Sequence, residues 1–228
     1  MLNGFSAKCV VKNGGGAEVH NILFEVPVGV SGRHVHLTRE HLDTLFGVGY
    51  ELTKIRDLVQ PGQFAAAETV TVVGPKGVLE RVRIIGPIRT YSQVEISRAD
   101  SFKLGLNPPI RDSGDHANSP GCTLIGPKGE VVLQKGVIIA LRHIHLSTSD
   151  AKRFDLRDHD IVAVSVSGER SLIFQNVLVR VNPNYKLEFH VDTDEANAAL
   201  LNNNDMVQVL RPVQNQQVSK LRVGVDSQ

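Results

Sequence analysis

The sequence predicts a mainly β fold, with two similar β-barrel domains capped by short α-helices. Short β-rich runs separated by closely spaced turn signals favour barrels, because helical periodicity is confined to a few short segments. The motif Arg-His-(Val/Ile)-His-Leu-(Ser/Thr) also occurs twice, at 33–38 and 142–147, 109 positions apart. Each copy precedes a short predicted helix, so a supersecondary unit is repeated and two similar domains are expected.

Three hairpins are predicted between β-rich runs. The Gly-Pro-Lys-Gly segments at 74–77 and 126–129 combine a proline, which presets φ, with glycines, which adopt positive φ. A third turn is expected at Gly168-Glu169. The strands joined by these turns, and others rich in β-branched residues, are expected at 21–30, 70–73, 82–89, 123–125, 137–142, 161–167, 172–181, 186–191 and 206–210.

Short helices are predicted after both histidine motifs. Thr38 is expected to cap the first, because its hydroxyl can accept a hydrogen bond from a free amide of the first turn, and Gly47 is expected to end it. Ser147 or Thr148 is expected to cap the second helix. A third, polar helix is expected near 193–201.

The expected domain division is discontinuous. Residues 19–33 and 142–211 are expected to form one β-barrel domain, and residues 34–141 the second. Residues 1–18 are expected to form a flexible tail, since they contain a Gly-rich linker, and they are the candidate for a weak targeting peptide. Residues 212–228 are polar and Gln-rich and are expected to form a tail without a role in the core.

Composition fits a globular protein and excludes several classes of partner. The chain has 228 residues and a net charge of +1 without a long basic run, so neither nucleic acid nor a membrane is expected as a partner. It lacks an apolar run of about 20 residues and a signal-peptide pattern. Its two cysteines, Cys9 and Cys122, have no CxxC spacing, which is typical of a reducing cytoplasm.

The repeated motif predicts a metal site. In a strand, residues i and i+2 point to the same face, so each His-x-His aims two imidazoles at one point, and imidazole suits Zn, Cu, Fe and Ni. Hydrogen-bonded histidines in a wet groove are the simpler alternative for one motif, but the duplication favours a metal. The first candidate ligands are His34, His36, His143 and His145. His190 is another, because its apolar sequence neighbours point to the opposite face.

Charged residues near these motifs are further candidates. Glu95 is the nearest carboxylate, although its sequence context alone favours a solvent-facing position. Arg89 has the planar guanidinium that binds phosphate or carboxylate through two hydrogen bonds. Arg33 and Arg142 point away from the adjacent histidines, so ordinary salt bridges are expected for them. The loop 111–121 has the Gly/Ser/Asp composition of ligand-binding loops.

Several motifs together resemble those of the PduL-type phosphate propanoyltransferases. In chain order they are Gly32-Arg33-His34-Val35-His36-Leu37, Gly86-Pro87-x-Arg89-x-x-Ser92-Gln93-Val94-Glu95, Arg111-Asp112-Ser113-Gly114, Gly126-Pro127-Lys128-Gly129, Arg142-His143-Ile144-His145 and the late His190. The resemblance covers residues 21 to 210. It implies a two-barrel fold, two zinc ions per chain and reversible acyl transfer between coenzyme A and inorganic phosphate: acyl-CoA + phosphate ⇌ acyl phosphate + CoA.

The resemblance also implies roles for individual residues. The implied zinc ligands are His34 and His36 for one ion, His143, His145 and His190 for the other, and Glu95 near both. Arg89 is expected to bind phosphate, and Arg89 and Glu95 are the catalytic candidates. Ser113 and Gly114 are candidate contacts for CoA or phosphate. We expect phosphate to attack the acyl carbon directly, without an acylated cysteine or serine.

The resemblance gives further expectations about substrate and location. Propanoyl is the habitual acyl group of the family, which is linked to propanediol degradation, and acetyl differs by one methylene. A homo-oligomer is expected. The expected location is the cytoplasm or the lumen of a bacterial microcompartment, with its shell as a candidate partner.

Two other interpretations stay open at this point. The spacing His34-x-His36-x3-Glu40 fits the first cupin metal motif, which predicts a mononuclear metal oxygenase or isomerase. Against it, Glu40 falls inside the predicted helix, and the later glycine-proline-histidine motif of cupins is not recognisable. A zinc-stabilised scaffold protein is the non-enzymatic alternative, and it would not need Arg89.

Overall fold

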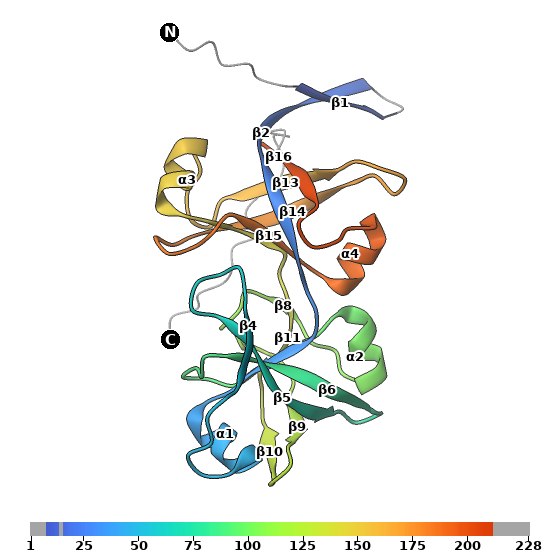
Figure 1. The fold of residues 1–228 in the computed structure, drawn as a ribbon. Helices are drawn as coiled ribbons and strands as arrows, with labels where there is room; N and C mark the ends of the chain where they lie inside the picture. Colours follow the sequence, from blue (N-terminus) through green and yellow to red (C-terminus); the bar gives the residue numbers. More distant parts are fainter. Residues whose placement is uncertain (1–7, 14–15, 212–228) are drawn as a thin grey trace, which may run out of the picture.

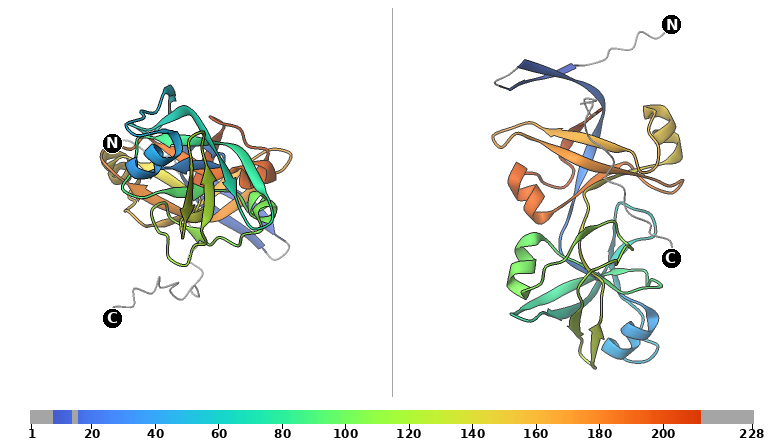
Figure 2. Two further views of the ribbon diagram at one scale, coloured as in Figure 1. Left: turned by 90° about the horizontal axis from the view of Figure 1, so that it is seen from below. Right: turned by 180° about the vertical axis from the view of Figure 1, so that it is seen from behind.

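The structure, a computed structural model, describes residues 8–13 and 16–211 (Figure 1). As predicted, the fold is mainly β, and it consists of a closed six-stranded barrel, a curled half-barrel sheet and, within the described residues, four short helices. The barrel and the half-barrel lie one above the other, and the long strand β2 leads from the first into the second (Figures 1 and 2).

The closed barrel is built from both ends of the chain. Its strands are, in spatial order, β2 (Gly16–Ser31), β15 (Glu188–Asp192), β12 (His143–Leu146), β14 (Leu172–Val181), β13 (Ile161–Val166) and β16 (Met206–Leu210). Antiparallel pairing of β16 with β2 closes it. Its interior contains apolar side chains from every wall, among them Val26, Ile144, Val164 and Phe189.

Strand β1 (Lys8–Asn13) differs from the expected N-terminal tail. It pairs antiparallel with the beginning of β2, from Lys8 opposite Asn21 to Asn13 opposite Gly16. Strand β2 is 16 residues long, so its first residues extend beyond the other barrel strands and offer β1 a free edge. The expectations for residues 1–7 and 14–15, which are part of the candidate targeting peptide, and for the tail 212–228 lie outside the described residues.

The half-barrel is formed by the middle of the chain. Its strands are, in spatial order, β10 (Glu130–Leu133), β9 (Cys122–Ile125), β5 (Phe64–Val73), β6 (Val78–Gly86), β3 (His34–His36), β7 (Gln93–Glu95), β11 (Val137–Ala140) and β8 (Ile110–Arg111), with β4 (Lys54–Asp57) paired to β5. Its hydrophobic core shares no residue with that of the closed barrel. We therefore propose the division into a domain of 19–33 plus 142–211 and a domain of 34–141.

Two predicted hairpins are confirmed as β5–β6 and β13–β14. The turn at 126–129 also closes a hairpin, but its second strand is β10, which was not predicted, whereas the expected partner 137–142 contains β11, which pairs parallel with β7 and β8. Both Gly-Pro-Lys-Gly turns pack on the end of a helix: the amide of Lys76 donates to the carbonyl of Leu104, and that of Lys128 to the carbonyl of Leu45, each at 3.0 Å. These bonds satisfy helix carbonyls that have no partner within their own helix.

The helices after the histidine motifs are confirmed. Helix α1 (Arg39–Phe46) begins at the cap Thr38, whose hydroxyl accepts from the amide of His41, and ends at Gly47. Helix α3 (Thr148–Phe154) begins at the cap Ser147.

Two further helices follow β7 and β15. The predicted polar helix is α4 (Thr193–Ala199), which begins with a capping box of Asp192 and Glu195. Helix α2 (Arg98–Leu104), capped by Ser97, was not predicted.

The repeat extends to the pairing of the histidine strands. Strand β3 lies parallel to β6 and antiparallel to β7, and β12 lies parallel to β14 and antiparallel to β15. As a result, His34 lies opposite Glu95, and His143 lies opposite His190. Glu95 and His190 therefore hold equivalent positions in the two halves.

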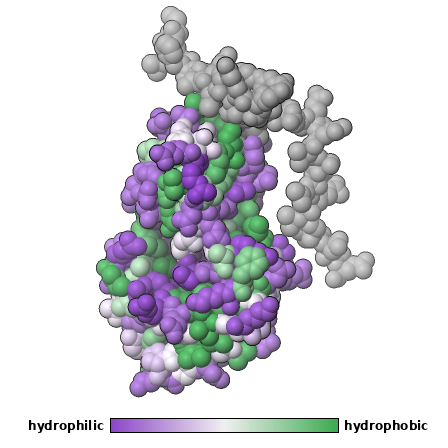
Figure 3. Space-filling view, turned by 90° about the vertical axis from the view of Figure 1, so that its right-hand side faces the viewer, coloured by the Kyte–Doolittle hydropathy of each residue, from purple (hydrophilic) through white to green (hydrophobic). Residues whose placement is uncertain are grey.

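None of the helices in the described ranges is long and apolar enough to span a membrane. Figure 3 shows polar and apolar side chains interspersed over one face of the two domains.

Candidate metal centre and active site

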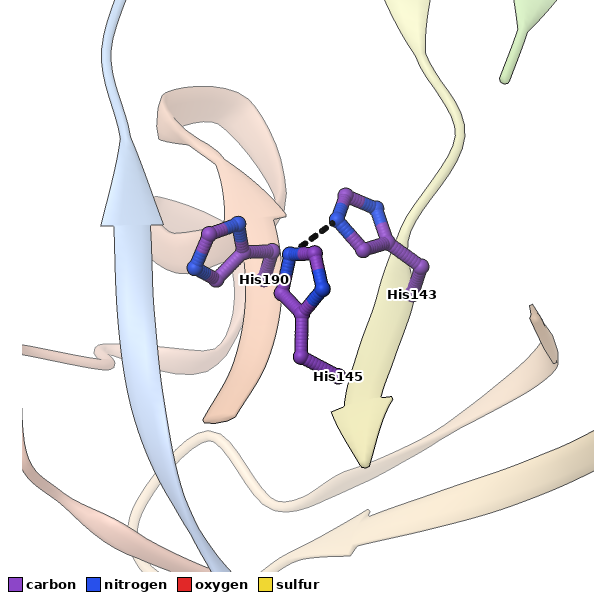
Figure 4. Close-up of side chains that lie close together, drawn as sticks. All are labelled: His143, His145 and His190. Carbon is purple, nitrogen blue, oxygen red and sulfur yellow. Dashed lines mark hydrogen bonds between the residues drawn. The ribbon is translucent and has the colours of Figure 1, made fainter. Parts of the chain in front are cut away.

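Three histidines of the closed barrel face one another (Figure 4). His143 and His145 lie on β12, and His190 lies on the neighbouring strand β15. Their ring centroids are 4.6 to 5.1 Å apart, and the Nε2 atoms of His143 and His145 are separated by 3.1 Å. Two nitrogens bound to one tetrahedral zinc lie about 3.3 Å apart, given Zn–N bonds of about 2.0–2.1 Å.

The hydrogen bonds of this cluster leave a place for a cation. The Nδ1–H of His143 donates to the carbonyl of Leu141 at 2.7 Å, so its Nε2 carries a lone pair. If His145 donates from Nε2 to that lone pair, its own buried Nδ1 is an acceptor with no partner among the described residues. If it does not, two lone pairs face each other at 3.1 Å. A cation bound by both Nε2 atoms removes this repulsion, and the donor set fits zinc.

A second cluster lies in the half-barrel and consists of His34 and His36 on β3 and Glu95 on β7. The Nδ1–H groups of the two histidines donate to the carbonyls of Gly32 at 2.9 Å and Ile85 at 3.1 Å. Each ring therefore presents the lone pair of Nε2, and that of His34 lies 3.5 Å from Glu95 Oε2. The ligand atoms of each cluster lie within 4.8 Å of one another, so each cluster offers three ligands to one ion.

Burial keeps the imidazoles of His36, His143 and His145 neutral, which is the state that binds a metal. Desolvation lowers the pKa of His36 well below its ordinary value, and the charges of His34 and Arg89 lower it further. Burial likewise lowers the pKa values of His143 and His145. Neutral rings offer lone pairs at physiological pH without first losing a proton.

Glu95 is buried rather than solvent-facing, which corrects the expectation from its sequence context alone. Its Oε1 accepts from Gln93 Nε2 at 2.6 Å and from Ser113 Oγ at 3.0 Å. The amide oxygen of Gln93 in turn accepts from the backbone N–H of Gly114 and from His116 Nε2, both at 2.8 Å. This network holds one carboxylate oxygen and leaves Oε2 free to face His34.

Arg89 lies beside the second cluster, where its charge acts on His36. Its guanidinium donates to Tyr91 Oη and Ser113 Oγ, both at 3.3 Å, and these neutral acceptors leave its charge available to an anion. In contrast, Arg33 and Arg142 form salt bridges, as predicted, with Asp100 at 2.5 Å and Glu195 at 2.9 Å.

Both clusters open into one cavity between the two domains. Its volume is about 850 Å³, which falls within the range of about 300–1,000 Å³ for small-molecule sites. The lining includes all six ligand candidates, together with Arg89 and Ser113. Gly114, the other candidate contact, instead donates its N–H to Gln93. One cavity thus brings together two metal-ligand clusters and a guanidinium.

Glu188 and Gln60 were not predicted, and the structure places both at the site. Glu188 is buried on β15, and its Oε2 lies 2.5 Å from His190 Nε2 and 3.0 Å from Gln60 Nε2. Burial acts to raise the pKa of Glu188, but the hydrogen bond and charge of His190 outweigh it, so the pKa is lowered. The spacing Glu188-x-His190 is a sequence signal for shared orientation, whereas no local pattern marks Gln60.

Comparison with known proteins identifies the family. The family model described as phosphate propanoyltransferase matches residues 27–202. A phosphate propanoyltransferase of Thermotoga maritima is 59% identical over 197 residues, which cover 85% of this chain and 94% of that protein. One of Priestia megaterium is 53% identical over 180 residues, covering 79% and 83% of the two chains, and one of Lachnoclostridium phytofermentans is 53% identical over 188 residues, covering 82% and 88%.

The match includes the strands that carry both clusters, the loop with Ser113 and most of the two hydrophobic cores. The chain therefore belongs to the phosphate propanoyltransferase family and is a phosphotransacylase.

Proposed function

We propose that this protein is a zinc-dependent phosphate acyltransferase that interconverts propanoyl-CoA plus phosphate with propanoyl phosphate plus CoA. The observation that supports this best is the pair of three-ligand clusters that open, with Arg89, into one cavity. The proposed zinc ligands are His34, His36, Glu95, His143, His145 and His190, two ions being bound per chain. When bound, zinc would polarise the thioester carbonyl and stabilise the departing thiolate.

The protein's own residues would orient the phosphate. Its negative charge is complementary to Arg89, whose planar fork can donate two hydrogen bonds to phosphate oxygens. Ser113, which lies 3.3 Å from the guanidinium, would help to fix the fork. A phosphate oxygen then attacks the acyl carbon, so that a C–O bond forms and the C–S bond breaks. The electron pair of that bond leaves with the CoA sulfur.

We propose direct attack, without an acylated enzyme. Burial raises the pKa of Cys122 to about 12, so this thiol is neither accessible nor ionised and makes a poor nucleophile. Labelled phosphate should therefore not exchange into propanoyl phosphate unless CoA is present. Exchange in the absence of CoA would reveal a covalent acyl-enzyme and contradict the proposal.

The first test combines metal content with activity. Purified protein should contain about two zinc per chain and should release CoA from propanoyl-CoA only when phosphate is added. Chelation of zinc should abolish the transfer, and added zinc should restore it. Zinc-loaded protein without phosphate-dependent CoA release would contradict the proposed role of the site.

Substitution of Arg89 tests phosphate binding separately from metal binding. A hydrogen bond to a charged group contributes about 1.5–3 kcal/mol, so Arg89→Ala should lower kcat/KM for phosphate about 10–100-fold. Zinc content should stay at the wild-type value, and Arg89→Lys should be intermediate because it keeps the charge but not the fork. Arg157→Ala, which removes an exposed arginine, is the matched control. An unchanged kcat/KM in Arg89→Ala would rule out this role.

The two other interpretations are set aside. Family membership assigns acyl transfer rather than the chemistry of a cupin or the role of a scaffold. In addition, Glu40, the third ligand of a cupin-like site, is exposed on α1, whereas buried Glu95 lies opposite His34.

The propanoyl preference, the homo-oligomer and the location stay predictions. Competition between acetyl-CoA and propanoyl-CoA tests the first, and one methylene discriminates by only about 1–3 kcal/mol. Size-exclusion chromatography tests the second. Co-fractionation with microcompartments distinguishes their lumen, with a shell partner, from the cytoplasm.

A further inference from the structure

The geometry points to Glu188 as a positioning residue that makes His190 a metal ligand through Nδ1, and to Gln60 as the residue that holds Glu188 from the opposite domain. This inference rests on the proposed zinc centre. It concerns groups that surround the ligands rather than the ligands themselves.

The His190 ring is oriented by its contact with Glu188. Its Nε2 lies 2.5 Å from Glu188 Oε2. An ionised carboxylate can only accept a hydrogen bond, so Nε2 carries the proton and Nδ1 carries the lone pair. Figure 4 shows one nitrogen of His190 directed toward His143 and His145 and the other directed away. The nitrogen that faces the cluster is therefore Nδ1.

His190 differs from three other histidine ligands in its hydrogen-bond partner. His34, His36 and His143 each donate from Nδ1 to a backbone carbonyl and present Nε2 to their cluster. His190 is reversed, because its partner is a carboxylate on the same strand face, two residues away. A carboxylate partner fixes the tautomer and increases the basicity of the ligand more than a neutral carbonyl does.

Gln60 connects the half-barrel to Glu188 across the domain interface. It lies between β4 and β5 of the half-barrel and is buried. Its Nε2 donates to the carbonyl of Lys186 at 2.9 Å and to Glu188 at 3.0 Å, and its Oε1 accepts from the amide of Lys186 at 3.2 Å. One of these three hydrogen bonds reaches the carboxylate that orients a ligand of the other domain, and the other two fix Gln60 to the backbone of Lys186 beside it.

Strand β2 leaves space for the Glu188 carboxylate. Gly29 of β2 lies opposite His190 in the parallel pair β2–β15. A Cβ atom at this position would lie 2.5 Å from Glu188 Oε1 and 2.9 Å from His190 Cδ2. Only glycine leaves room for the Glu188–His190 pair, so the neighbouring strand is adapted to it.

The experiment measures zinc affinity, which does not require turnover. The two zinc-binding steps are titrated against a chromophoric chelator in wild type, Glu188→Gln, Glu188→Ala and Gln60→Ala. The step that disappears in His143→Ala identifies the cluster that contains His190. Glu169→Gln, on an exposed turn, and Gln63→Ala, in the same loop as Gln60, are the matched controls. Cobalt-substituted protein gives a second readout through its absorption spectrum.

We expect Glu188→Gln to weaken the step assigned to His143 about 10–100-fold and to leave the other step unchanged. Glutamine keeps an acceptor for His190 but removes the charge, so Glu188→Ala should be weaker still. Gln60→Ala should have a smaller effect on the same step, and its cobalt spectrum should shift. Both controls should bind zinc like wild type.

The opposite results are equally clear. If both zinc-binding steps keep their wild-type affinity in Glu188→Gln and in Glu188→Ala, the inference is overturned and the proposed function stays intact. Equal weakening of both steps would also overturn it, because this would indicate a general loss of structure. If Glu188→Ala does not fold, the isosteric glutamine variant decides. Wild-type protein that binds no zinc would instead refute the proposed function, and the inference with it.

Discussion

Replacing Gln93 with leucine tests whether the buried polar network stabilises the half-barrel. Gln93 is fully buried and makes four hydrogen bonds, to Glu95 at 2.6 Å, Ser113 at 2.9 Å, Gly114 at 2.8 Å and His116 at 2.8 Å. Leucine has a similar volume, so the substitution removes these bonds without opening a large cavity. Glu95 would then keep Ser113 as its remaining donor for Oε1.

The expected loss follows from the kinds of bond removed. The bond to the Glu95 carboxylate is worth about 1.5–3 kcal/mol, and the three neutral bonds about 1 kcal/mol each. Burial of the apolar leucine offsets about 1–2 kcal/mol. We therefore expect a net loss of about 2.5–5 kcal/mol in the free energy of unfolding. At about 2–4 °C per kcal/mol for a chain of this size, Tm should fall by about 5–20 °C.

Urea unfolding measures this loss, and zinc titration shows its effect on the site. Because Glu95 loses its best donor, zinc affinity at the His34–His36–Glu95 cluster should fall about 10–100-fold. Gln134→Leu, at an exposed position, should change stability by less than about 0.5 kcal/mol. A loss below about 1 kcal/mol in Gln93→Leu, with unchanged zinc affinity, would refute the view that this network holds the carboxylate.

The remaining predictions concern a thiol, a helix cap and a close contact. The raised pKa of Cys122 keeps its thiol neutral at pH 8. In a Cys9→Ser variant, where Cys122 is the remaining cysteine, the folded protein should therefore resist iodoacetamide and the protein in urea should react fully, as mass spectrometry would show. Reaction of the folded protein would contradict the burial of Cys122. Asp192→Ala removes the cap of α4 and should cost about 0.5–2 kcal/mol in urea unfolding; an unchanged midpoint would show that the cap is dispensable. Gly29→Ala should displace Glu188, lower the free energy of unfolding by about 1–3 kcal/mol and weaken zinc binding at the cluster that contains His190. A wild-type stability together with a wild-type zinc affinity would show that strand β2 can shift to make room.

Local chemistry explains which elements could be predicted from the sequence. The cap Thr38 and the end at Gly47 lie within a few residues of the helix that they delimit, and α1 was found within these limits. The Gly-Pro-Lys-Gly turns likewise lie within the hairpins that they close, but the positive φ expected of their glycines was wrong. These positions need glycine because a Cβ at Gly74 or Gly126 would collide with the carbonyl at the end of a helix. Helix α2 was missed because its seven residues expose Phe102 and bury only Ser101 and Leu104, which leaves no helical apolar period to detect.

The environment of the site residues could not be predicted, because it depends on distant pairings. Periodicity places two side chains on one face of a strand but does not reveal what that face meets. Glu95 is buried because β7 pairs with β3 and because the loop with Ser113 folds over it. Gln60 meets Glu188 across 128 positions of sequence, a contact that only the docking of two domains creates.

The way in which the chain passes between its two domains has a mechanical consequence. Between residues 16 and 211 it crosses twice, through Gly32-Arg33 and Leu141-Arg142, and each crossing ends directly at the first histidine of a cluster. A salt bridge connects each crossing to a helix, through Arg33 to Asp100 of α2 and through Arg142 to Glu195 of α4. The segments that join the two domains are therefore also the segments that anchor both clusters. Because each domain carries one cluster, rotating one domain against the other would change the distance between the two clusters. The width of the cavity and the separation of the two metal sites would therefore change together.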